Sequence, residues 1–162
     1  MANTLEKLGL KVNVPGGWDA RIYQTPFAGA VLQASNRKLS DDYSDFGDPS
    51  WIASMPPGGI FAAVIEQDPA FAGSGIYAQG LDLPLRPSDA GENGIPQTTP
   101  GVAGLQQFFS AAGRAFALFV VTSTAQGMHG GFESVNGILR SLEISPGNYM
   151  ADIPPIYLEP VP

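Results

Sequence analysis

The longest apolar pattern in the chain lies in residues 101–123 and predicts a β-hairpin. In residues 115–121 both alternating faces are apolar, so a strand there needs cover on both sides. The preceding run, residues 105–109, is interrupted by two glutamines, which places part of it near water. Gly113 stands between the runs and can supply the positive φ of a short connection. The pattern predicts a buried central strand beside a partly exposed neighbour.

Shorter alternating or apolar runs predict four more strands, at residues 10–14, 21–23, 30–34 and 60–65. The first two are expected to pair with each other across the Pro15-Gly16-Gly17 turn. Residues 60–65 are apolar on both faces and predict a second central strand. Glu66 and Asp68 follow it and are expected at its solvent-exposed end.

Two segments have helical features. Asp48-Pro49 is typical of a helix start and predicts a short helix over Ser50–Met55. The second segment, Phe132–Leu142, has apolar residues at helical spacing and Arg140 near its end, which suits the helix dipole. We therefore predict an α+β domain, in which an antiparallel sheet of about six strands is flanked by short helices.

The predicted domain covers residues 1–145 and contains a long Pro- and Gly-rich connection at residues 80–101. Residues 146–162 form a Pro-rich segment that predicts an extended arm. Because its apolar residues would be wet on a free arm, we expect them to bind a partner surface. The predicted partner-binding residues are Tyr149, Ile153, Pro154, Pro155, Ile156, Tyr157 and Leu158.

Charge and composition narrow the classes of function. The 162 residues carry a formal net charge of −7, and residues 41–99 hold nine acidic side chains against Arg86 alone. No basic stripe is available to neutralise phosphates, which argues against nucleic-acid binding. No run is long enough to span a bilayer, and residues 1–10 show no signal-peptide pattern. A cytoplasmic protein is expected, with signal-independent export or a virion location as alternatives.

The candidates for chemistry are few. The chain has no cysteine and a single histidine, His129, in a glycine-rich stretch without a sequence-level partner. The cluster Asp41, Asp42, Asp45 and Asp48 does not have the ligand spacing of a calcium loop. Glu66 and Asp68 are spaced like an acid/base pair, but no aromatic sugar platform accompanies them. The sequence predicts no catalytic residue, no metal and no cofactor.

Large aromatic residues offer a bland and a functional interpretation. Trp18 and Trp51 are expected to be core residues, with Trp18 closing the first hairpin. Phe108-Phe109 is expected to belong to the buried hairpin, and a ligand platform made by the two rings is the less favoured alternative.

Three stretches resemble the PsbP-like fold group, which includes photosystem-associated proteins, a eukaryotic Ran-binding protein and DcrB-type bacterial proteins. They are Val14-Pro15-Gly16-Gly17-Trp18, the late hairpin Phe108–Val121 and the helix ending Ile138–Ile144. Gly104–Phe116 is also similar to a G-x-Q-x-F-F…A-G-R-x-F segment of uncharacterised actinobacterial proteins. The resemblance covers residues 8–145 in outline. It implies an antiparallel sheet flanked by helices and used for binding and assembly.

Three functions follow as hypotheses. The leading one is a non-catalytic binding or structural subunit that associates with itself or a protein partner through its C-terminal arm and loops. The second is a small-molecule-binding or hydrolytic domain with a pocket between sheet and helix, lined by Trp18, Phe108 and Phe119. The third is a component of a virion or a secretion apparatus.

Overall fold

The computed structural model describes residues 3–24, 29–41, 51–52, 54, 56, 58–86, 102–123 and 128–149. Within this part of the chain, eight strands form two antiparallel sheets. The strands are β1 (Asn3–Lys7), β2 (Leu10–Val14), β3 (Asp19–Gln24), β4 (Ala30–Ser35), β5 (Ile60–Gln67), β6 (Val102–Ala111), β7 (Arg114–Ser123) and β8 (Glu143–Ile144). The helix α2 spans Met128–Ser141, and 3-10 turns η1 and η2 span Pro69–Phe71 and Gly75–Tyr77. The expected α+β class fits in outline, but the expected single six-stranded sheet is wrong.

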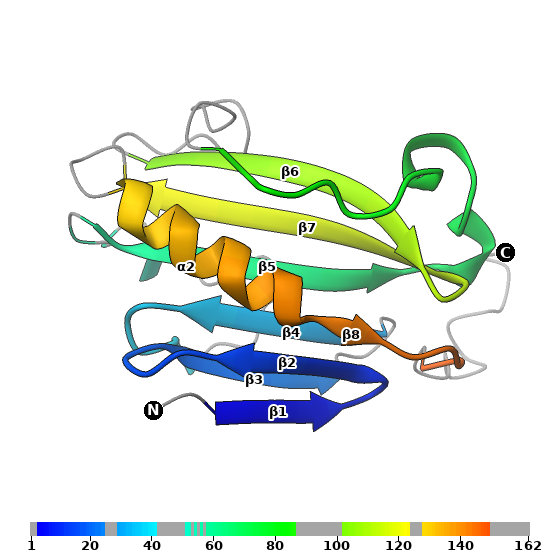
Figure 1. Ribbon diagram of the computed structural model, residues 1–162, viewed down its shortest axis with the longest axis horizontal. Coiled ribbons are helices and arrows are strands. Elements are labelled where there is room, and N and C mark those ends of the chain that lie inside the picture. Colours follow the sequence, from blue (N-terminus) through cyan, green and yellow to red (C-terminus); the bar gives the residue numbers. More distant parts are fainter. Residues whose placement is uncertain are drawn as a thin grey trace, which may run out of the picture.

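The larger sheet has the strand order β3-β4-β5-β7-β6 (Figure 1). Its last two strands are the predicted hairpin, which pairs without interruption from Val102↔Ser123 to Ala111↔Arg114. Ala112 and Gly113 both have positive φ, at 54° and 76°, as a two-residue hairpin turn of the twist-compatible type requires. The predicted hairpin is confirmed.

The smaller sheet has the order β1-β2-β8 and corrects the predicted pairing at the start of the chain. β2 pairs with β1 and β8, whereas β3 pairs with β4 in the other sheet. The turn after β2 therefore carries the chain from one sheet to the other and does not close a hairpin. β1 was not predicted, because its sequence NTLEK has one apolar residue besides polar and charged ones. Positive φ angles at Leu8 and Gly9 make the tight turn between β1 and β2.

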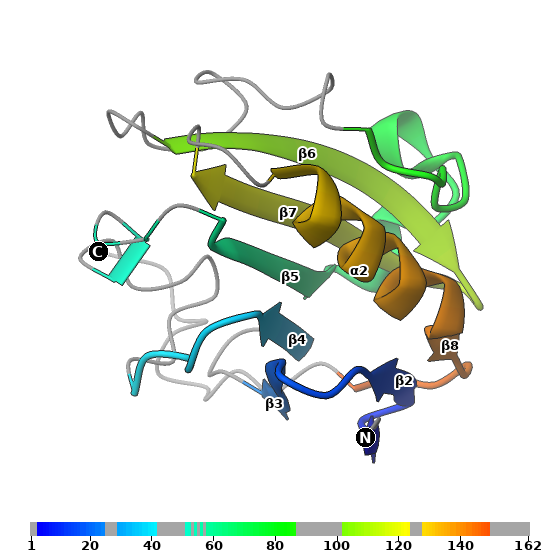
Figure 2. The same ribbon diagram turned by 60° about the vertical axis from the view of Figure 1, so that its left-hand side comes forward.

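Helix α2 and the smaller sheet lie on the same face of the larger sheet (Figures 1 and 2). The larger hydrophobic core fills this space and joins Leu10 and Val12 of β2, Leu118 of β7, and Phe132 and Val135 of α2. The predicted amphipathic helix is confirmed. It begins at Met128, four residues before the predicted start.

The opposite face of the larger sheet carries a second, smaller core. Phe61 and Ile65 of β5 meet Phe119 and Val121 of β7 there, with Trp51 packed against them. Every side chain from residue 115 to residue 121 is at most 7% exposed. The expectation that this strand is covered on both faces is confirmed.

The predicted short helix and the arm lie mostly beyond the described part of the chain. Trp51 and Ile52 are helical, while Ser50, Ala53 and Met55 lie outside the described residues. Among the helices that the structure describes, none combines the length and apolar character needed to cross a membrane.

Candidate binding site

The polar centre of the domain is a buried ion pair between Arg114 and Glu66. Arg114 Nε donates to Glu66 Oε2 at 2.8 Å, and Nη2 donates to Oε1 at 3.0 Å. The two side chains are 1% and 2% exposed. Glu66 Oε1 also accepts from the backbone N–H of Ala30 at 3.0 Å. Because both carboxylate oxygens are occupied in this way, Glu66 is not free to accept a proton from a substrate.

Arg114 also holds segments that are distant in sequence. Its Nη groups donate to the carbonyls of Leu8 at 3.1 Å, Gly9 at 3.4 Å and Ser145 at 3.0 Å. Gly9 has a φ of +75°, and a Cβ built there would lie 2.5 Å from Arg114 Nη1. One side chain therefore connects the larger sheet to the β1–β2 turn and to the chain after β8.

Tyr149 belongs to this cluster. Its ring lies over the Arg114 guanidinium, with 4.4 Å from Cζ to the ring centroid. Its carbonyl accepts a hydrogen bond from Gln24 Nε2 at 2.5 Å. Tyr149 thus makes contacts within its own domain, four residues beyond the predicted boundary at residue 145. The other predicted partner-binding residues, Ile153, Pro154, Pro155, Ile156, Tyr157 and Leu158, lie outside the described residues.

The expected solvent-exposed acidic pair is corrected by this arrangement. Glu66 lies on the same strand face as Ile60, Ala62 and Val64, which belong to the larger core. Asp68 is exposed and caps η1, where its Oδ1 accepts from Ala70 N at 2.9 Å. One carboxylate is buried in an ion pair and the other ends a turn, so they do not act as a pair.

The loop after β5, residues 68–80, presents apolar side chains to solvent. Phe71 is 48% exposed and Ile76 is 64% exposed, and they are the exposed large hydrophobic residues among those described. Residues 69–81 contain no charged side chain. We refer to residues 68–80 as the apolar loop.

Hydrogen bonds from β6 hold the apolar loop in place. Ser110 Oγ accepts from Gly73 N at 2.9 Å and donates to the Tyr77 carbonyl. Ser110 N donates to the Gln79 carbonyl at 2.9 Å. A single serine of β6 thereby fixes three points of the loop, so its conformation is set before any partner arrives.

Aromatic rings continue this support. Phe71 stacks on Tyr77 with ring centroids 5.7 Å apart, and Tyr77 meets the edge of Phe108 at 5.5 Å. Phe109 instead stacks on Phe116 in the larger core at 5.3 Å. Neighbouring residues of a strand point to opposite faces, so Phe108 and Phe109 do not form one ligand platform.

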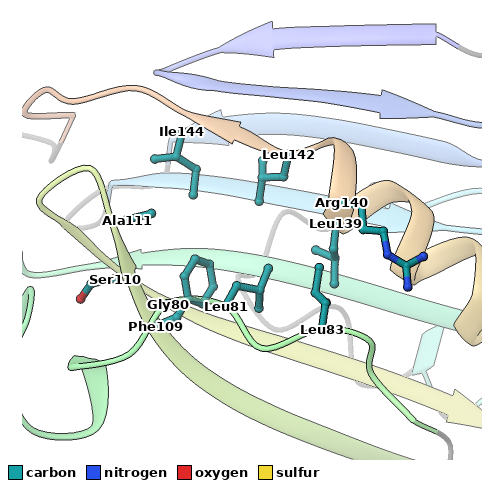
Figure 3. Close-up of a pocket in the computed structure, with 10 residues that line it drawn as sticks. All are labelled: Gly80, Leu81, Leu83, Phe109, Ser110, Ala111, Leu139, Arg140, Leu142 and Ile144. Atoms are coloured by element: carbon teal, nitrogen blue, oxygen red, sulfur yellow. The ribbon is translucent and has the colours of Figure 1, made fainter.

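A groove of about 450 Å³ opens between the end of α2, β8, β6 and residues 80–83 (Figure 3). Its apolar side chains point toward one another from both walls, and they are Leu81, Leu83, Phe109, Leu139, Leu142 and Ile144. Ser110 and Arg140 are the polar side chains that line it.

Asn136 fixes the coil that forms one wall of the groove. Its Oδ1 accepts from Leu85 N at 2.7 Å, and its Nδ2 donates to Leu85 O at 2.9 Å, both in buried surroundings. The side chain replaces a strand partner for Leu85. It thereby holds the end of residues 80–86 against α2.

We expect Asn136→Ala to lower the free energy of unfolding by about 2 kcal/mol, because two buried backbone groups of Leu85 lose their partners. Urea unfolding followed by tryptophan fluorescence measures the change. Asn13→Ala is the control, since the Asn13 side chain is exposed and bonds Thr4 at the surface. Equal effects of the two substitutions would contradict the assigned role of Asn136.

The pocket expected from the sequence is not assembled from its predicted residues. Trp18 packs against the larger core, while Phe119 lies in the smaller core on the opposite face of the sheet. Phe108 contacts the apolar loop, as described above. The groove is lined by a different set of residues, among which Phe109 is the aromatic one.

The remaining candidates have separate positions. His129 lies in the first turn of α2 and not in a loop, and its side chain is outside the described part. Asp41 is exposed, while Asp42, Asp45 and Asp48 are outside it. No group of three potential metal ligands occurs among the residues that the structure describes.

Trp51 has the structural role that the sequence predicts. Its ring packs on Phe61 with centroids 5.5 Å apart, and its Nε1 donates to the Lys38 carbonyl at 2.9 Å. Arg37 lies over the ring, 4.2 Å from the centroid, and burial lowers the pKa of this arginine.

Sequence reasoning missed the Arg114–Glu66 pair, although two signals pointed to it. Arg114 shares its strand face with Phe116, Leu118 and Val120, and Glu66 shares its face with the apolar residues of β5. Opposite charges that each follow an apolar face of a predicted central strand indicate a buried pair.

A scan against models of protein families, a search of curated proteins and a search of solved structures found no match to this chain. The resemblance to the PsbP-like fold group therefore stays a prediction.

Proposed function

We propose that this protein is a non-catalytic binding subunit that associates with further copies of itself through the apolar loop and its C-terminal segment. The observation that carries the proposal is the exposure of Phe71 and Ile76 on a loop whose conformation is already fixed. Aromatic and aliphatic side chains in such positions are typical anchors of protein interfaces.

Preorganisation and charge both favour association at this loop. A segment that is ordered before binding loses little conformational entropy when the complex forms. Two copies that each carry a net charge of −7 repel one another in general. The absence of charged side chains from residues 69–81 makes the apolar loop a place where this repulsion is weakest.

The C-terminal segment is the second part of the proposed interface. Tyr149 is anchored on Arg114, so the chain beyond it starts from a fixed point of the domain. In our proposal Ile153, Pro154, Pro155, Ile156, Tyr157 and Leu158 bind the neighbouring copy. The prolines favour an extended conformation, which reduces the entropy lost on binding.

The geometry of the acidic residues supports a role without catalysis. Glu66 is occupied by Arg114 and Ala30, and Asp68 is occupied as a turn cap. Assembly into a virion or a secretion apparatus has the same physical basis and stays a hypothesis about where the subunit acts.

We expect the wild-type protein at about 100 μM to sediment above its monomer mass of 17.0 kDa. Phe71→Ser with Ile76→Ser should weaken association at least about tenfold, because both apolar anchors are lost. Gln79→Ser in the same loop is the matched control, since its side chain is polar and exposed. Analytical ultracentrifugation over a concentration series gives the dissociation constants.

Truncation after Tyr149 tests the C-terminal part in the same experiment. This variant keeps the ring that covers Arg114, so its fold should be retained while its association weakens. A wild-type protein that stays monomeric would refute self-association. Unchanged association in the truncated variant would confine the interface to the apolar loop.

A further inference from the structure

We infer that the groove is a binding site for a small amphiphile with one aliphatic chain and one anionic head group, such as a free fatty acid. The site is distinct from the proposed protein interface. The inference rests on how the groove is lined, on its size and on the single cation at its edge.

The groove is a place where the larger core is incompletely covered. Leu81, Leu83, Leu142 and Ile144 pack against that core and are each only partly buried. They face one another across the groove, as Figure 3 shows. An aliphatic chain laid between them would remove their remaining apolar surface from water, which is favourable in proportion to the area covered.

The size of the groove sets the scale of the ligand. A volume of about 450 Å³ lies within the range of small-molecule sites. One aliphatic chain fits this scale, and the groove is open to solvent at the surface, so a polar end can stay wet.

The polar side chains determine what that polar end must be. Ser110 lines the groove, but its hydroxyl already accepts from Gly73 and donates to Tyr77. Arg140 is exposed, and its guanidinium makes no hydrogen bond or ion pair with the described residues. Arg140 is thus the polar side chain of the lining that is available to a ligand, and as a cation it selects an anion.

Nearby carboxylates do not compensate this cation. Glu143 is directed to Lys11, with 3.9 Å between Oε2 and Nζ. Asp82 lies in the coil between two lining leucines but is not itself part of the lining. A carboxylate, as in a fatty acid, therefore meets one positive charge beside an apolar trough.

The test uses dodecanoate as the probe, added below its micelle concentration and followed by isothermal titration calorimetry. We expect one dodecanoate per chain with a dissociation constant below about 1 mM. Arg140→Gln should weaken binding about tenfold, since one charge-assisted contact is lost. Lys38→Gln is the matched control: the same charge is removed from an exposed residue outside the groove, and binding should be unchanged.

A second variant tests the apolar part of the site. Ala111 lines the groove, and Ala111→Trp should fill it and abolish dodecanoate binding while the melting temperature shows that the domain is folded. Dodecan-1-ol tests the head group and should bind about tenfold more weakly than dodecanoate. The inference is overturned if dodecanoate does not bind at 1:1 stoichiometry, if Ala111→Trp binds it normally, or if Arg140→Gln and Lys38→Gln behave alike. These results are independent of whether the protein self-associates.

Discussion

Arg114→Met is expected to lower the free energy of unfolding by about 3–5 kcal/mol. The substitution leaves the Glu66 carboxylate buried without its counter-charge, and it removes the donors to the carbonyls of Leu8, Gly9 and Ser145. Urea unfolding at neutral pH measures the change. Methionine keeps most of the side-chain volume, so the loss reports the polar contacts more than a cavity.

A double-mutant cycle separates the ion pair from the other contacts of Arg114. Glu66→Gln retains an acceptor for Ala30 N–H but leaves a buried guanidinium unpaired. The Arg114→Met/Glu66→Gln variant should therefore be destabilised by clearly less than the sum of the two single changes. Additive effects would show that the pair is not energetically coupled. Single effects below about 1 kcal/mol would contradict its assigned position at the centre of the fold.

Phe116→Ala is expected to cost about 3–5 kcal/mol, the usual range for removing a buried aromatic ring. The Phe116 side chain is fully buried, stacks on Phe109 and lies 5.2 Å from the Arg114 guanidinium. The surrounding elements are sheet and helix, which collapse poorly into a cavity. Chemical denaturation gives the difference in stability.

Phe71→Ala is the matched control for this substitution. It removes the same ring from an exposed position and should change the stability of the monomer by no more than about 0.5 kcal/mol. Similar losses for the two variants would contradict the distinction between the core and the apolar loop. Because Phe116 and Arg114 are in contact, their substitutions should be non-additive when combined.

Local patterns predicted much of the fold. The hairpin of β6 and β7 was recognisable because two apolar runs meet at a glycine, and α2 because its apolar residues recur at helical spacing. The strand β1 was missed, since an exposed strand on a small sheet needs little apolar surface. The division into two sheets depends on pairs such as Leu10↔Ile144, which no short stretch of sequence encodes.

The candidate site was less accessible to sequence reasoning for the same reason. The groove is formed by residues 80–83, by β6 and by the chain from Leu139 to Ile144, which meet only after folding. The exposure of Phe71 and Ile76 likewise depends on how Ser110 fixes the loop. The composition of residues 69–81 showed the lack of charge, but it did not show which side chains face outward.

The pairing of β2 with β8 also sets the order of events when the protein is made. β2 is synthesised among the first residues, whereas its partner β8 and the carbonyl of Ser145 come more than a hundred residues later. Contacts of such sequence separation are slow to form. A nascent chain on the ribosome can assemble the hairpin of β6 and β7, but it cannot cover Arg114 until Tyr149 has emerged. Until then β2 keeps an open edge.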